Sequence, residues 1–242
     1  MTYLEMVNEV LVRMREDEIA SVTDPNNEPQ QKLVCKFVND ARSFVDKSHT
    51  WNVQRKIWVV DLAKGMPAYT LFDSAESGSV YSCRWAGSGG RLNEANARWL
   101  SQKKQTYGTP LYYSPGYVSN HEMQIRVWPT PDEENEKGGD VAEYNIAEYN
   151  EAEYSGGRIS SNKTTLVLEG YKATPRLVND NDSILLPIDP VMYYALAYSS
   201  RERGEVGGQT SGELFALGKQ YLSDAIAWDV NNAPLEYLWS TR

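Results

Sequence analysis

The sequence has few of the residues from which most catalytic and metal centres are built. Its 242 residues include only two histidines and two cysteines, Cys35 and Cys83. Two cysteines this far apart cannot form a Cys-rich zinc site, and no glycine-rich loop ends in the Gly-Lys-Ser/Thr that holds phosphate and magnesium. Neither a Gly-x-Ser-x-Gly elbow nor a His-Glu-x-x-His motif occurs. The sequence therefore predicts no catalytic, cofactor-binding or metal-ligating residues, and no enzymatic activity.

Long apolar runs are also missing from the sequence. None approaches the roughly 18 residues of a membrane-spanning helix. Residues 1–11 carry acidic side chains and lack the basic n-region of a signal peptide. We therefore expect a protein made in the cytoplasm, with no membrane partner and with cysteines that need not be bonded.

Acidic charge is concentrated in one segment. The net charge of the chain is −9, and residues 132–154 contain nine acidic residues and a single basic one, Lys137. The rest of the chain is therefore almost neutral. A broad basic face for nucleic acid is disfavoured, although a ring whose bore passes DNA without gripping the phosphates remains compatible with this balance.

Hydrophobic periodicity places helices towards the two ends of the chain and strands in the middle. Helices are predicted over residues 2–17, 29–49, 93–105, 189–203 and 211–228, and strands over 57–62, 68–72, 80–85, 111–113, 123–128 and 165–171. We expect residues 165–171 to be the antiparallel partner of residues 123–128. The order predicts an α+β fold: the N- and C-terminal helices form a helical bundle, and an antiparallel β-rich module is inserted between them.

These elements imply a division of the chain into domains. Residues 1–56 and 187–230 are expected to form the helical scaffold, and residues 57–186 the β-rich insertion. Within the insertion, residues 132–161 are expected to form a long acidic hairpin or loop, and residues 231–242 a separate C-terminal segment.

The acidic segment contains an Ala-Glu-Tyr repeat with a period of five, which places tyrosines at Tyr144, Tyr149 and Tyr154. This period matches neither a helix nor a strand. One interpretation is a solvated loop that is disordered when the protein is alone. The other is an extension whose tyrosines contact a neighbouring subunit, because tyrosine offers a large contact area at a small entropic cost.

Several stretches resemble the head–tail adaptors of short-tailed bacteriophages, the family that includes tail tubular protein A. They are Gly108-Thr-Pro-Leu-Tyr-Tyr113, Ile125-Arg-Val-Trp-Pro-Thr-Pro-Asp132, the strand from Leu166 to Tyr171, and Asp182-Ser-Ile-Leu-Leu-Pro-Ile-Asp189. Their succession covers most of the chain. One departure is that about thirty residues follow the Pro-x-Pro-Asp turn, where the family usually returns quickly to the next strand.

The resemblance implies a virion structural protein at the head–tail junction, made in the host cytoplasm. It implies a homo-oligomeric ring of about twelve copies, a dodecamer, in which a heterologous contact is repeated by rotation. The portal protein and the tail nozzle protein are the implied partners, with a tail fibre as a further candidate. DNA is expected to pass through the ring without sequence-specific binding, and no cofactor is implied.

The C-terminal segment is unusually apolar for a chain end. Pro234 ends the last predicted helix, and Leu235, Tyr237, Leu238 and Trp239 follow within five positions. Chain ends are usually polar and mobile unless something holds them. The segment either folds back on its own subunit or docks on the portal or a neighbouring adaptor. The resemblance favours docking.

Other functions remain open at this point. One is a head-completion or connector protein of a long-tailed phage. A carbohydrate-binding module or a glycan hydrolase is compatible with 16 tyrosines, seven tryptophans and many carboxylates. However, the acids concentrate in a flexible-looking segment, and paired catalytic carboxylates need a rigid pocket that separates their pKa values.

Overall fold

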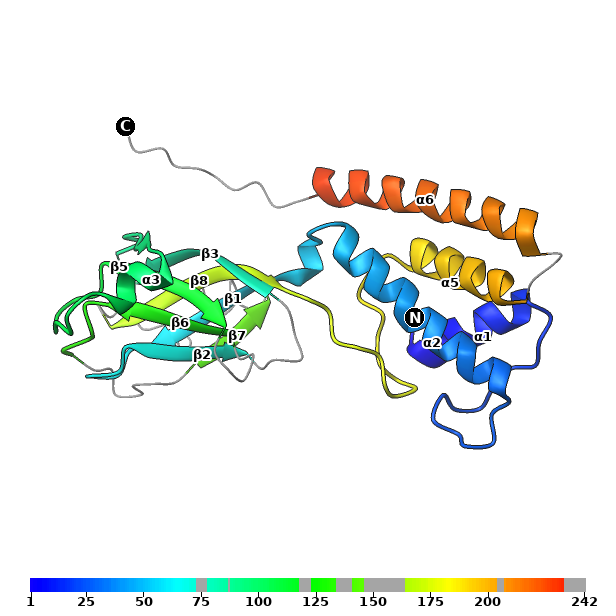
Figure 1. The fold of residues 1–242 in the computed structure, drawn as a ribbon, viewed down its shortest axis with the longest axis horizontal. Coiled ribbons are helices and arrows are strands. Elements are labelled where there is room, and N and C mark those ends of the chain that lie inside the picture. The colour runs from blue at the N-terminus through cyan, green and yellow to red at the C-terminus, as the bar shows by residue number, and fades with distance from the viewer. Residues whose placement is uncertain are drawn as a thin grey trace. The chain divides into compact units, whose positions relative to one another are not determined.

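The structure is a computed structural model that describes residues 1–72, 78–86, 88–117, 123–133, 141–145, 164–203 and 207–232. The chain divides into two compact units. Residues 1–53 and 174–242 form a unit whose regular elements are helices, and residues 54–173 form a unit built on two β-sheets (Figure 1). Each unit has its own hydrophobic core and is described separately.

Four helices belong to the helical unit: α1 (Tyr3–Arg13), α2 (Pro29–Ser48), α5 (Ile188–Glu202) and α6 (Gly207–Asn231). The predicted capping box of α1 is confirmed, because Thr2 Oγ1 accepts from the Glu5 amide at 3.2 Å and Glu5 accepts from the Thr2 amide at 2.8 Å. Such reciprocal bonds satisfy amides that have no partner within the helix. The predicted start of α2 at Pro29 is also confirmed.

The core of this unit lies between α1, α2 and α5. Its fully buried members include Met6, Val10, Val38, Val191 and Ala195. Non-helical chain after Thr174 completes the core with Leu177, Ile184 and Leu186. Asn39 on α2 holds this return segment, since its side chain donates to the Leu177 carbonyl and accepts from the Leu177 amide, both at 3.1 Å.

The prediction of a helical bundle formed by the N- and C-terminal helices is wrong. The α+β class stands, but two antiparallel-rich sheets form a mainly β-rich core, and the helices are not arranged as such a bundle. In the helical unit α1 has only 11 residues, and an irregular segment supplies part of the core. On α6, Leu217, Tyr221 and Trp228 stay exposed to differing degrees, and only the ring of Tyr221 among them stacks on a described aromatic neighbour, Tyr193. Periodicity identifies an apolar face, but not whether that face is covered.

The β unit contains two four-stranded sheets. The first has the order β3 (Gly78–Trp85), β8 (Thr165–Lys172), β1 (Arg55–Asp61) and β7 (Val141–Asn145), with all neighbours antiparallel. The second has the order β2 (Ala68–Phe72), β6 (Met123–Trp128), β5 (Tyr112–Tyr117) and β4 (Asn93–Glu94), with β4 parallel to β5. The helix α3 (Ala97–Ser101) and the 3-10 turn η1 (Asn52–Gln54) complete the described elements of the chain.

The two sheets share one core. Trp58, Val60 and Leu168 from the first sheet are buried together with Tyr69, Ile125 and Val127 from the second. Along β6 the buried residues alternate with more exposed ones, as expected for a strand with one covered face. The unit is therefore a sandwich of two sheets around an apolar interior.

Two further expectations about this unit are wrong. Residues 165–171 do not pair with residues 123–128, because β8 lies between β1 and β3 while β6 lies between β2 and β5. The predicted helix over residues 93–105 is only the five residues of α3, preceded by the short strand β4. The order of β6 and β8 along the sequence suggested a hairpin. However, β7 lies between them in the sequence and joins the first sheet beside β1, and no local sequence pattern indicated this change of sheet.

Candidate assembly surfaces

A stripe of large apolar side chains is exposed along α6. Leu217 is 40% exposed, Tyr221 36% and Trp228 70%, and their spacing places them close to one face of the helix. The opposite face of α6 packs on α5, where Gly218 lies against the ring of Tyr194. Exposed tryptophan and tyrosine on one helix face are typical of protein–protein contact surfaces. We call these three residues the α6 stripe.

One end of the stripe is supported by an aromatic stack. The rings of Tyr193 and Tyr221 lie 4.8 Å apart with an interplanar angle of 11°. The guanidinium of Arg13 lies 5.8 Å from the centre of the Tyr193 ring. Because residues from α1, α5 and α6 meet here, the stripe is held on a rigid base.

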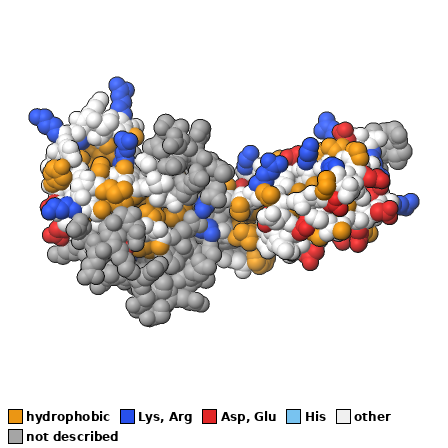
Figure 2. All heavy atoms as spheres, turned by 90° about the horizontal axis from the view of Figure 1, so that it is seen from below, with side chains coloured by type: hydrophobic (Ala, Val, Ile, Leu, Met, Phe, Trp, Pro, Cys, Tyr) orange, Lys and Arg blue, Asp and Glu red, His pale blue; other side chains and the backbone are white. Residues whose placement is uncertain are grey.

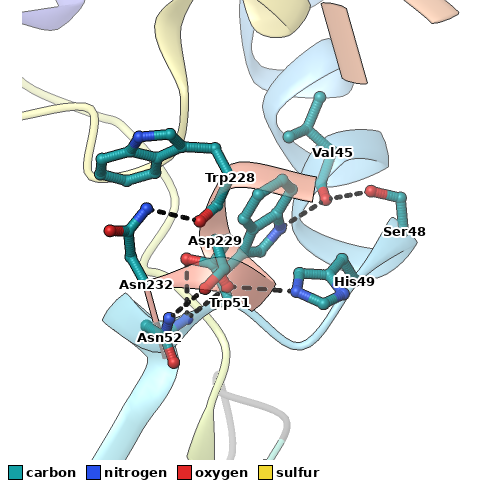
Figure 3. A network of polar contacts seen from close by, with 8 residues as sticks. All are labelled: Val45, Ser48, His49, Trp51, Asn52, Trp228, Asp229 and Asn232. Atoms are coloured by element: carbon teal, nitrogen blue, oxygen red, sulfur yellow. Dashed lines mark hydrogen bonds and ion pairs between the residues drawn. The ribbon is translucent and has the colours of Figure 1, made fainter. Parts of the chain in front are cut away.

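The C-terminal end of α6 is anchored by Asp229 (Figure 3). Its carboxylate accepts a hydrogen bond from the Asn52 amide at 3.1 Å and lies 3.1 Å from Nε2 of His49. Asn52 also donates from its side chain to the Asp229 carbonyl at 2.9 Å. The last turn of α6 is thus fixed to the chain that follows α2.

Trp51 braces the same corner. Trp51 is 1% exposed, and its indole Nε1 donates to the Val45 carbonyl at 2.9 Å. The same carbonyl also accepts from the Ser48 hydroxyl at 2.7 Å. The rings of His49 and Trp51 meet edge to face at 4.9 Å. This packing orients His49 towards Asp229, a pairing that sequence analysis missed because about 180 residues separate the partners.

The predicted contact residues of the C-terminal segment, Leu235, Tyr237, Leu238 and Trp239, lie outside the described residues. The structure fixes where this segment begins. Asn232 folds back onto the Trp228 carbonyl through its amide at 3.0 Å and its side chain at 2.7 Å. The segment therefore starts beside the anchored end of α6.

The three tyrosines of the acidic repeat are not brought together by the described residues. Tyr144 belongs to β7, and its backbone is opposite Ile57 in β1. Tyr149 and Tyr154 lie outside the described residues, as does most of the segment 132–161. The first repeat is therefore partly built into the sheet.

Two clefts of the described residues differ in their acidic lining, and neither is lined by a pair of carboxylates. A cleft of about 290 Å³ between α1, α2 and α5 has one acidic lining residue, Glu202. A second cleft, of about 380 Å³ beside α3, has none. No group of three potential metal ligands occurs in the part of the chain that the structure describes.

Both thiols are buried in the hydrophobic cores and unpaired with each other. Burial raises the pKa of Cys35 to about 11 and that of Cys83 to about 12. Because the reactive form is the thiolate, neither residue has the environment of a nucleophile.

Comparison with known proteins identifies the family. A family model described as SU10 adaptor protein matches residues 1–235. The chain belongs to the SU10 adaptor protein family. No curated protein matches it.

Membership in the SU10 adaptor family makes this protein a bacteriophage adaptor and a component of the virion. The resemblance to phage head–tail adaptors is confirmed at the level of the family. None of the described helices is long and apolar enough to cross a membrane.

Proposed function

We propose that the protein forms a ring of about twelve copies that joins the portal to the tail nozzle and lets DNA pass. The family match over residues 1–235 carries this proposal, because it covers both structural units and the anchored end of α6. The proposed location is the head–tail junction of the virion. The proposed role is structural, with no catalytic step and no cofactor.

The α6 stripe and the C-terminal segment supply the contacts in this proposal. Burial of Trp228 alone, which is 70% exposed, contributes roughly 1.5–3 kcal/mol before ordering costs. Leu235, Tyr237, Leu238 and Trp239 would add apolar area next to the stripe, docking between portal subunits or on a neighbouring adaptor. The segment follows a helix end that Asp229 anchors. A rigid helix end reduces the entropy that is lost when such a segment docks, and this favours binding by the segment.

The acidic extension has a separate part in the proposal. Tyr144, Tyr149 and Tyr154 are proposed to contact a neighbouring subunit or the tail. Repeating each contact around the ring makes a firm joint from small gains per subunit.

Truncation after Pro234 tests the portal contact. The shortened protein should remain folded, since the core that the described residues form ends at Ile226, but it should fail to join purified portal rings in electron micrographs. A protein lacking only the last three residues, Ser240 to Arg242, is the matched control and should still join them. Normal joining by the protein truncated after Pro234 would show that the C-terminal segment is not the portal contact.

A further inference from the structure

An aromatic cluster with a lysine over it lies on the second sheet of the β unit. The ring centres of Trp99, Tyr112 and Trp128 are 5.1–5.9 Å apart. Nζ of Lys103 lies 4.2 Å from the centre of the Trp99 ring and 5.6 Å from that of Trp128. We call these four residues the aromatic–lysine patch.

The element that carries the patch has no core of its own. The helix α3 contains no buried residue, and residues 101–107 are all exposed. It is held instead by its Asn96 cap, which accepts from the Arg98 amide at 2.8 Å, and by Trp99 against the sheet. An ordered element with no buried residue, whose one tryptophan lies among partly exposed rings, has the character of an interface.

The charge around the patch is positive. Residues 91–107 contain four basic residues and one acidic residue, Glu94. The cleft of about 380 Å³ beside α3 is lined by Lys103 and Arg126, and none of its described lining residues is acidic. Figure 2 shows Lys and Arg side chains beside exposed hydrophobic ones on the β unit. This surface suits a partner that brings both carboxylates and aromatic rings.

We propose that the aromatic–lysine patch receives residues 146–154, the last part of the acidic segment, of a second copy of this chain. Residues 141–145 are held as β7 in the first sheet of their own subunit, and residues 146–154 beyond them supply three glutamates, two tyrosines and no basic residue, so they offer both complements. Each subunit has one patch and one segment, so pairing passed from each copy to the next is a heterologous contact, the type that generates a ring when its rotation closes. The inference rests on the proposed ring and names one of its subunit contacts.

Single-stranded nucleic acid is a weaker fit to this patch. Bases bind such surfaces by stacking on exposed aromatic faces. Here Lys103 already covers a face of Trp99, since its Nζ is 4.2 Å from the ring centre. A lysine over the ring face can pair with a carboxylate, but it blocks the face on which a base would stack.

Disulfide trapping between copies tests the pairing. Ser101 lines the cleft and is exposed, and Ala147 lies in the second Ala-Glu-Tyr repeat, so S101C and A147C place thiols on the two sides without removing patch or tyrosine residues. Two full-length chains of different tag length, each with one of these substitutions, are mixed under mild oxidation. A mixed disulfide dimer is expected. Buried Cys35 and Cys83 should not contribute.

Three controls give each result a meaning. S79C, an exposed serine on the other sheet, should give no dimer with A147C. Adding K103E and R126E to the S101C chain should lower the yield by about tenfold, and E148K with E151K on the opposite chain should restore much of it. The proposal would be overturned if S79C gave as much mixed dimer as S101C. It would also be overturned if the dimer yield did not change with the charge substitutions.

Two other outcomes would also overturn it. One is a disulfide that forms only within a single chain carrying both S101C and A147C, because the segment then occupies its own subunit. The other is binding of labelled single-stranded DNA to the protein, if this binding is lost in the K103E variant. Portal joining is measured on the same samples: if it persists while trapping fails, only this inference falls, and if trapping succeeds while joining fails, the proposed function falls instead.

Discussion

Asp229 and Asn52 form a two-way connection across 177 residues of sequence. The Asn52 amide donates to the Asp229 carboxylate at 3.1 Å, while the Asn52 side chain donates to the Asp229 carbonyl at 2.9 Å. His49 adds a contact of 3.1 Å to the same carboxylate. Three interactions thus hold the end of a helix whose other face is exposed.

We predict that D229A lowers the free energy of unfolding by about 1–3 kcal/mol, because the Asn52 amide and His49 lose a partly buried partner. Urea denaturation followed by circular dichroism measures the change. D224A is the control, since Asp224 is exposed on the same helix, and it should change stability little. Equal stability of the D229A protein and the wild type would show that the anchor does not stabilise the unit.

The second prediction concerns the β sandwich. A Cβ at Gly170 would lie 2.2 Å from the Ser79 carbonyl oxygen and 2.7 Å from the Trp58 ring. G170A should therefore destabilise the unit by about 1–3 kcal/mol, because β3 or the core must shift. G116A is the control, because a Cβ there has no described neighbour within 4 Å. Unfolding followed by tryptophan fluorescence distinguishes the two, and equal loss in both would contradict the packing argument.

The third prediction is a pH dependence that comes from Asp182. Its carboxylate accepts from the Val178 and Asn179 amides at 2.5 and 2.7 Å, and these bonds hold the pKa of Asp182 below its usual value. Since the folded state has the lower pKa, the stabilising contribution is present above the unfolded pKa of about 4 and disappears as the pH falls through the folded pKa.

D182N should therefore lose less stability than the wild type when the pH falls below about 4. The free energies of unfolding of the two proteins are compared across that range by urea denaturation. D224N, which alters an exposed carboxylate on α6, should follow the wild-type profile. A D182N profile parallel to that of the wild type would contradict the role of this carboxylate.

Local chemistry allowed much of the secondary structure to be predicted. The capping box at Thr2 and the helix start at Pro29 depend only on residues close together in the sequence. Both occur in the structure where they were expected. Alternation along residues 123–128 identified β6, whose buried residues follow that pattern. The family resemblance rested on similar short stretches and is confirmed by the match over residues 1–235.

Relationships between distant residues could not be predicted in this way. Which strands lie beside β8 depends on pairing across 81 to 116 residues, and the expected hairpin with β6 was wrong. Similarly, the α6 pattern suggested a packed face, but Leu217, Tyr221 and Trp228 are exposed. The patch around Lys103 was missed because Trp99 and Trp128 meet only when α3 lies on the sheet.

The last prediction uses the α6 stripe to separate assembly from folding. Trp228 is 70% exposed, so W228S removes almost no buried area within the subunit and should leave the midpoint of urea unfolding nearly unchanged. If the stripe is a contact surface, the same change removes a large anchor and should weaken assembly by about tenfold or more. The fraction of protein in rings, or bound to portal, is measured by sedimentation against protein concentration.

M66S is the matched control, because Met66 is also exposed, at 40%, but lies in the β unit. Rings that form equally well from the W228S protein and the wild type would exclude Trp228 from the assembly surface, whereas a loss of folding in the W228S protein would mean that its indole is covered within the subunit.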